Sequence, residues 1–174
     1  MKTEVLFRVL IISLLISLGV CAGCNSKRLA GLVPAGGVVT FNGEIVADAT
    51  VAFVPKDKTE NSRTATAITD GQGKFTLTTL DPNDGIFPGE YTVTVMKVKT
   101  DSGLSEQEIL DSAREDIIIV PKNPTITYLI PEKYERIEES GLEITIPPNG
   151  KKDILLELTG TVSGKAIPVN SLRR

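Results

Sequence analysis

The chain has 174 residues, with 19 Lys and Arg against 22 Asp and Glu, and it contains no His. Without His it lacks the usual general base for a Ser or Cys nucleophile and the commonest zinc ligand, which argues against hydrolases and zinc enzymes that depend on it. The mildly acidic balance, with no more than two Lys or Arg in a row, as at the terminal Arg173-Arg174 pair, argues against a nucleic-acid-binding protein.

The first 23 residues have the pattern of a signal peptide. Lys2 and Arg8 give a positive start, and an apolar run follows over residues 9–20. This run is too short to span a bilayer, which needs about 20 apolar residues, and it matches the apolar region of a secretory leader.

The leader ends in Cys21-Ala22-Gly23-Cys24. This end of the leader resembles the lipobox of bacterial lipoproteins, although Cys21 occupies the position where Leu is usual. The resemblance implies cleavage before Cys24, a thioether from its sulfur to diacylglycerol, and acyl chains such as palmitate. A plain secretory signal and an uncleaved anchor are the alternatives. With Cys24 alkylated, the processed chain has no disulfide available and must fold around its own apolar core.

The expected organisation is a signal peptide over 1–23, a tether over 24–35, one domain over 36–160 and a flexible tail over 161–174. A domain of this length can bury its own core. The expected location is the cell envelope, on the extracytoplasmic side of a membrane. The sequence leaves open whether the inner or the outer membrane holds the lipid.

Short β-branched and aromatic runs alternate with turn residues through the domain. Asn42-Gly43 predicts a type I′ hairpin, and Asp70-Gly71-Gln72-Gly73 predicts a second tight turn. Seven or more short strands of this kind indicate an all-β, antiparallel sandwich. The predicted strands are 37–41, 44–46, 50–54, 64–69, 75–78, 91–95, 117–120, 125–130, 142–146 and 154–158.

One short helix interrupts the strands. Ser105 and Glu108 have the spacing of a capping box, and residues 109–114 complete about two turns inside a polar insertion over 99–116. Because a helix this short is marginal in water, we expect a mobile surface excursion. Docking of the helix to a partner is the alternative.

Several blocks then resemble those of carboxypeptidase regulatory-like domains, and the last two resemble the closing motifs of a lipoprotein subgroup with that domain. The blocks are residues 37–43, 49–55, 69–75, 88–95, 130–134 and 140–142. The resemblance implies a transthyretin-like, seven-stranded Greek-key sandwich with an accessory role and no defined reaction. Transthyretin-like hydrolases depend on His, so this chain departs from that subfamily.

The aromatic residues of these blocks have structural interpretations. We expect Phe53 and Phe75 to fill the core from opposing sheets, and Tyr91 to reach a backbone partner with its hydroxyl. Tyr134 is the one aromatic residue singled out as a ligand contact, for a sugar. No enzyme activity is expected, because adjacent carboxylates such as Glu138 and Glu139 point to opposite faces of a strand.

Two functions therefore stand. The first is a lipid-anchored, non-catalytic envelope module that presents loops or an edge strand to a protein partner. The second is an accessory module that binds a carbohydrate, a peptide or calcium. For calcium, oxygens would come from Asp81, Asp84 and Glu90, although solvated loop carboxylates are the simpler interpretation. No cofactor is expected.

Overall fold

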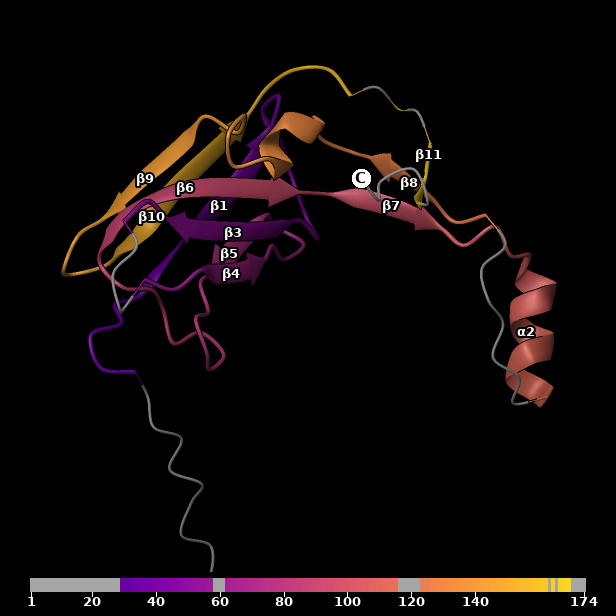
Figure 1. Ribbon diagram of the computed structural model, residues 1–174, viewed down its shortest axis with the longest axis horizontal. Coiled ribbons are helices and arrows are strands. Elements are labelled where there is room, and N and C mark those ends of the chain that lie inside the picture. The colour runs from indigo at the N-terminus through magenta and orange to yellow at the C-terminus, as the bar shows by residue number, and fades with distance from the viewer. Residues whose placement is uncertain (1–28, 58–61, 116–122, 163, 165, 170–174) are drawn as a thin grey trace, which may run out of the picture.

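A computed structural model describes residues 29–57, 62–115, 123–162, 164 and 166–169 (Figure 1). The expected signal peptide, Cys24 and the strand expected at 117–120 lie outside these residues. The described chain is mostly β-structure in several sheets, which confirms the all-β prediction. Within it, no helix is both long and apolar enough to cross a membrane.

Two four-stranded sheets form the body of the molecule. The β1 sheet has the order β10-β1-β2, with β5 also paired to β1, and the β3 sheet has the order β4-β3-β6-β9. The strands of the β1 sheet are β1 (Ala35–Phe41), β2 (Glu44–Ile45), β5 (Lys74–Thr76) and β10 (Lys151–Leu158). Those of the β3 sheet are β3 (Thr50–Pro55), β4 (Ala65–Ile68), β6 (Gly89–Met96) and β9 (Leu142–Ile146).

The sheets are not antiparallel throughout, which corrects the sequence-based expectation. β1 and β10 pair in parallel, with Gly37 opposite Ile154 and Phe41 opposite Leu158. Parallel neighbours need a long crossover, and here the crossover is the whole chain between them. The two strands approach so closely that a Cβ on Gly37 would lie 1.8 Å from the Ile154 carbonyl oxygen, which explains a Gly at this position.

The core lies between the two sheets. Alternate residues of β6 and β10 point inward, and Val93, Ile154 and Leu156 are among the buried side chains. The Phe53 ring on β3 lies 6.1 Å from that of Phe75 on β5, so rings from opposing sheets meet as predicted. The Tyr91 hydroxyl donates to the Phe87 carbonyl at 2.8 Å, which confirms the expected backbone partner.

Both predicted turns are present. Asn42 and Gly43 have φ angles of 50° and 86°, as a type I′ hairpin between β1 and β2 requires. In the second turn the Asp70 carboxylate accepts hydrogen bonds from the backbone N–H groups of Gln72 at 2.8 Å and Lys74 at 2.9 Å. These local bonds direct the chain from β4 into β5.

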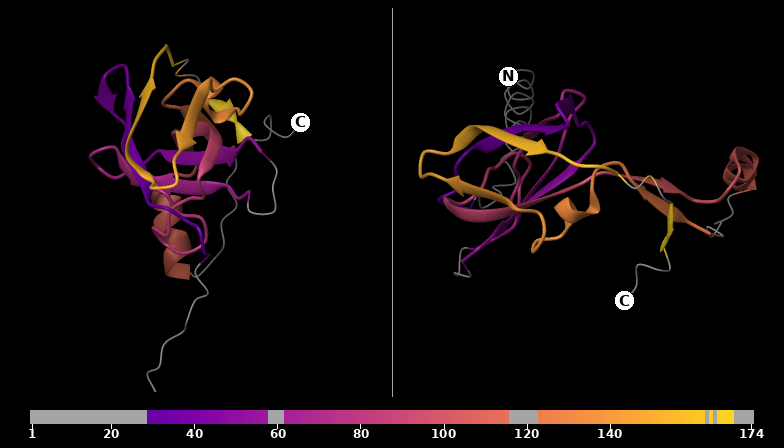
Figure 2. Two further views of the ribbon diagram at one scale, coloured as in Figure 1. Left: turned by 90° about the vertical axis from the view of Figure 1, so that its left-hand side faces the viewer. Right: turned by 90° about the horizontal axis from the view of Figure 1, so that it is seen from above.

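A third, smaller sheet and a helix extend from the body as an arm. The sheet has the order β11-β8-β7, and α2 follows β7 (Figures 1 and 2). The arm consists of β7 (Val98–Asp101), α2 (Glu106–Glu115), β8 (Thr125–Tyr128) and β11 (Ile167–Pro168). The helix was predicted, whereas β7 was not, because Lys99, Thr100 and Asp101 lack the apolar alternation of a half-buried strand.

Two short segments outside the expected domain of 36–160 pair with the rest of the chain. Ile167 and Pro168, predicted to lie in a flexible tail, pair with Ile126 and Thr125 of β8. At the other end, Val33 exchanges two backbone hydrogen bonds with Ile86, of 2.8 and 3.0 Å, so the expected tether is already part of the body there. Sequence periodicity missed both segments because each is too short to show a repeat.

Candidate interaction surfaces

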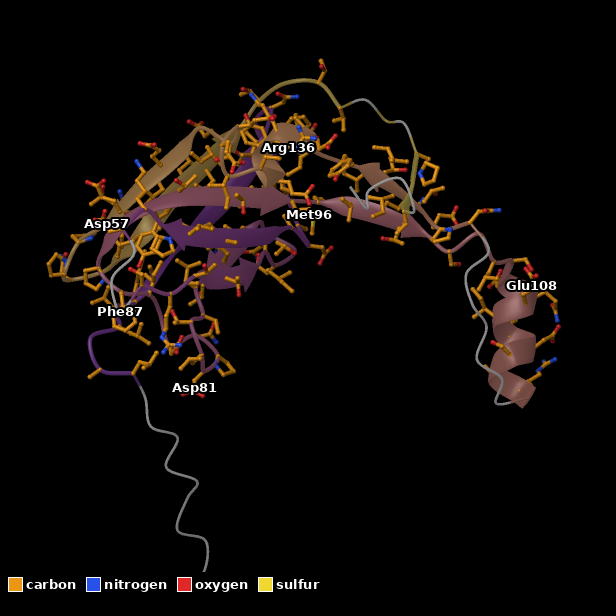
Figure 3. The ribbon with its side chains drawn as sticks, viewed as in Figure 1. Asp57, Asp81, Phe87, Met96, Glu108 and Arg136 are labelled. Atoms are coloured by element: carbon orange, nitrogen blue, oxygen red, sulfur yellow. The ribbon has the colours of Figure 1, made fainter. Side chains whose placement is uncertain are left out.

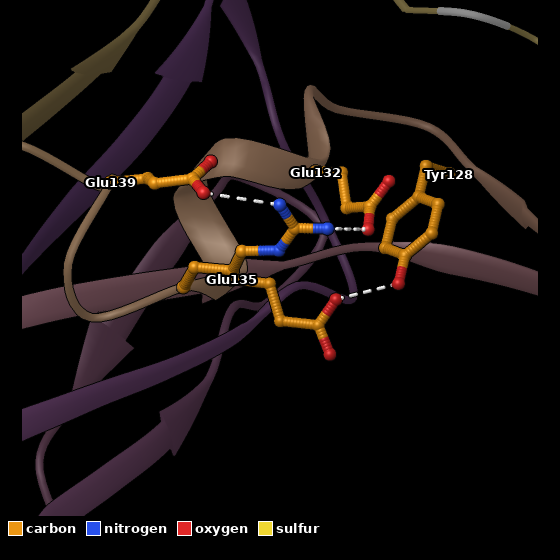
Figure 4. A network of polar contacts seen from close by, with 5 residues as sticks. Tyr128, Glu132, Glu135 and Glu139 are labelled. Atoms are coloured by element: carbon orange, nitrogen blue, oxygen red, sulfur yellow. Dashed lines mark hydrogen bonds and ion pairs between the residues drawn. The ribbon is translucent and has the colours of Figure 1, made fainter. Parts of the chain in front are cut away.

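The arm joins the body at a polar network around the 3-10 helix η1 (Glu132–Glu135). The Tyr128 hydroxyl donates to the Glu135 carboxylate at 2.7 Å, and Arg136 pairs with Glu132 and, at 3.1 Å, with Glu139 (Figure 4). Burial, the hydrogen bond to Glu135 and its negative charge raise the pKa of Tyr128 to about 12. Tyr128 therefore stays a neutral donor that ties the end of β8 to η1.

Tyr134, the expected ligand contact, lies within the core. Its side chain is 4% exposed, and its hydroxyl accepts from the Thr159 N–H at 2.9 Å and donates to the Thr159 carbonyl at 3.1 Å. Sugar binding needs an exposed aromatic face, and the burial of this ring weighs against that role.

A second side chain holds the same segment. The Asn42 amide donates to the Gly160 carbonyl at 3.1 Å and accepts from the Gly160 N–H at 3.2 Å. Together Asn42 and Tyr134 fix the chain where it leaves β10 for the arm. Sequence reasoning missed this role, because the partners of Asn42 lie 118 residues away.

In the acidic loop that suggested a calcium site, the Asp84 carboxylate accepts hydrogen bonds from the backbone of the loop itself. The Asp84 oxygens accept hydrogen bonds from the backbone N–H groups of Thr79, Leu80 and Asp81, at 2.7, 3.0 and 2.9 Å. Burial raises the pKa of Asp84, but the backbone N–H bonds outweigh it and the net pKa is lowered. Among the described residues, no three His, Cys, Asp or Glu side chains gather into a metal site.

A groove of about 560 Å³ opens beside strands β1, β5 and β10. We call it the β1 groove and define it by Gly36, Gly37, Val38, Leu155, Lys74 and Lys152. Gly36 is buried and Gly37 half-buried, and the apolar side chains that reach the surface of the groove are the half-buried Val38 and the exposed Leu155. The volume lies in the range of about 300–1,000 Å³ that is typical of ligand pockets.

The helix α2 lies at the far end of the arm, away from both sheets (Figures 1 and 2). It begins with the predicted capping box: the Glu108 carboxylate accepts from the Ser105 N–H at 2.9 Å, and the Ser105 Oγ accepts from the Glu108 N–H at 3.3 Å. Figure 3 shows Glu108 on α2, far from Met96 and Arg136 at the junction.

One stripe of α2 is apolar and open to solvent. Ile109 and Leu110 are 49% and 48% exposed, and Ala113, which follows them by four and three positions, is also exposed. Residues at these spacings share a helix face. A surface helix normally buries such a face, so this stripe, which we call the α2 stripe, is a candidate contact.

A scan against protein-family models and searches of curated proteins and of solved structures found no match to this chain. Its function is therefore argued from its own residues and geometry.

Proposed function

We propose that this chain is a lipid-anchored, non-catalytic β-sandwich module of the cell envelope, and that its arm binds another protein. The proposal includes a transthyretin-like Greek-key topology, related to carboxypeptidase regulatory-like domains. Two facing four-stranded sheets support it, together with the sequence blocks that fall on β1, β3, β5 and β6.

The observation that carries the binding role is the α2 stripe. Ile109 and Leu110 stay about half exposed, at 49% and 48%, on a helix held away from the body by β7 and β8. Burying an apolar side chain of this size stabilises a complex by roughly 1.5–3 kcal/mol relative to full exposure. A projecting helix with such a face fits the helix-in-groove mode of recognition.

The anchor would keep the body near the membrane. Nine positions separate Cys24 from Val33, the first of the described residues whose backbone pairs with the body. Fully extended, nine residues span at most about 30 Å. The indigo start of the coloured chain and α2 lie on opposite sides of the molecule, so the arm would present its helix away from the point of attachment (Figure 1).

Fractionation of cells tests the anchor. We expect Cys24→Ser to abolish lipidation and release the protein from membranes, because only a thiol at that position can form the thioether. Cys21→Ser is the matched control and should stay in the membrane fraction with its lipid. Quantitative membrane association of Cys24→Ser would contradict lipidation at Cys24.

Cross-linking in intact cells, followed by mass spectrometry, tests the partner. We expect Ile109→Asp with Leu110→Asp to reduce captured protein at least about tenfold, because a charge in an apolar contact removes a central anchor of the interface. Ile45→Asp is the control, since Ile45 is 59% exposed but lies on β2 of the body. Equal capture by the unchanged protein, the double variant and the Ile45→Asp control would contradict binding through the arm.

A further inference from the structure

We propose that the partner of the arm is a second copy of this chain, whose β1 groove receives the α2 stripe. This inference rests on the proposed function, because it names the occupant of the same helix. It joins two exposed features of one molecule that have complementary shape and charge.

The apolar parts of the two surfaces match. The β1 groove has a volume of about 560 Å³, and its lining includes the half-buried Val38 and Leu155, which is 56% exposed. The α2 stripe is convex and presents Ile109, Leu110 and Ala113 in one line. Docking would remove both apolar surfaces from water together.

The charges match as well. Within the described chain, the side chains of Lys74 and Lys152 form no ion pair, and both line the groove. On α2, the Glu106 carboxylate precedes Ile109 and Leu110 by three and four positions, and so lies on the face of the α2 stripe.

The contact would form between copies and not within one. The groove lies against the strands of the body, whereas α2 lies at the far end of the arm (Figures 1 and 2). A helix of one copy in the groove of the next is a head-to-tail contact, which repeats along a row of copies or closes into a ring. Copies anchored to one membrane would meet at high local concentration.

Site-specific photo-cross-linking of the full chain in membranes tests this directly. Two forms with different affinity tags are co-expressed, and one carries a photoreactive amino acid in place of Ala113. We expect a cross-link to the other form, mapped by mass spectrometry to residues 36–38 or 152–155. The same probe at Asp111, which lies on another face of α2, is the control and should give little product.

Charge reversal tests the same contact independently. We expect Lys74→Glu with Lys152→Glu in the acceptor form to reduce the cross-link at least about tenfold, because like charges across an interface repel strongly. Glu106→Lys in the donor form should restore it, because Glu106 lies on the same face of α2 as Ile109 and Leu110. Circular dichroism of each variant checks that the sheets are intact.

The outcomes separate this inference from the proposed function. Cross-links from Ala113 to a different protein alone would overturn the second copy as partner and leave an arm-binding module. Cross-links between copies that map outside the groove would overturn the groove as the receptor. No cross-link from Ala113 to any protein would overturn both proposals.

Discussion

Thr69 shows how much a single buried hydroxyl organises in this fold. It is 2% exposed, accepts a hydrogen bond from the Ala49 N–H at 2.8 Å and donates one to the Val46 carbonyl at 2.7 Å. The hydroxyl thus satisfies two backbone groups of the segment between β2 and β3. Buried polar groups in native proteins are almost always paired in this way.

We expect Thr69→Val to lower the free energy of unfolding by about 1–3 kcal/mol, because the same-sized side chain leaves a buried donor and acceptor unsatisfied. Urea denaturation measures the change. Thr76→Val is the matched control, since Thr76 is exposed on β5 and should alter the free energy by no more than about 0.5 kcal/mol. Equal effects at the two positions would show that Thr69 does not hold this segment.

Asp84 predicts a pH dependence of stability. Its folded-state pKa is lowered: burial raises it, but hydrogen bonds from the N–H groups of Thr79, Asp81 and Leu80 favour the charged form more. A carboxyl with a lowered folded pKa adds stability above its unfolded pKa, which is about 3.9 for Asp. That contribution is lost as the pH falls through the folded pKa.

We therefore expect Asp84→Asn to lower the free energy of unfolding by about 1–3 kcal/mol near pH 7. The difference in this free energy between the variant and the unchanged protein, here called the gap, should become smaller below about pH 4. Thermal unfolding across this pH range measures the gap. Asp81→Asn is the control from the same loop, because the described chain shows no hydrogen bond to the Asp81 carboxylate. A gap that does not change with pH would exclude the charge of Asp84 as the cause.

Among the elements, α2 depends most on its local sequence. The capping box of Ser105 and Glu108 satisfies N–H groups at its start, and neither sheet of the body packs on it. A ten-residue helix without tertiary support is marginal in water, so a small local change should shift its population.

We expect Ser105→Ala to destabilise the helix by about 1 kcal/mol and to lower the helical carbon chemical shifts of residues 106–114 in NMR spectra. Ser112→Ala makes the same chemical change inside the helix, where Ser112 bonds back to the Ile109 carbonyl. Because Ala is the better helix former, that variant should raise helicity. The same sign of change in both variants would rule out the cap as the cause.

At the scale of the whole molecule, body and arm differ in how they are held. β6 lies between β3 and β9 and buries Tyr91, Val93 and Val95, whereas β7 exposes three of its four residues. Stability in a protein follows buried apolar contacts and protected backbone bonds. The arm and the body should therefore open at different free energies.

We expect backbone amides of β7, β8 and α2 to exchange with deuterium at least about a hundredfold faster than those of β3 and β6. Hydrogen exchange followed by mass spectrometry measures this with the unaltered protein. Exchange of the arm at the rate of the central strands would mean that the two parts unfold as one unit. Slower exchange of α2 at higher protein concentration is expected if copies associate.

Local patterns by themselves determined the all-β class, both tight turns, the capped helix and the facing pair Phe53 and Phe75. These features depend on neighbouring residues: Asn-Gly tolerates positive φ, Ser and Glu three apart cap a helix, and alternation buries one face. The same kind of pattern predicts the leader and the lipid on Cys24.

Only the tertiary structure decided the parallel pairing of β1 and β10, the arm built from β7, β8 and β11, and the burial of Tyr134. Each depends on partners far apart in the chain, as Tyr134 and Thr159 or Ile126 and Ile167 are. No local pattern encodes such a pairing, because its free energy comes from packing and hydrogen bonds formed after the chain has folded back on itself.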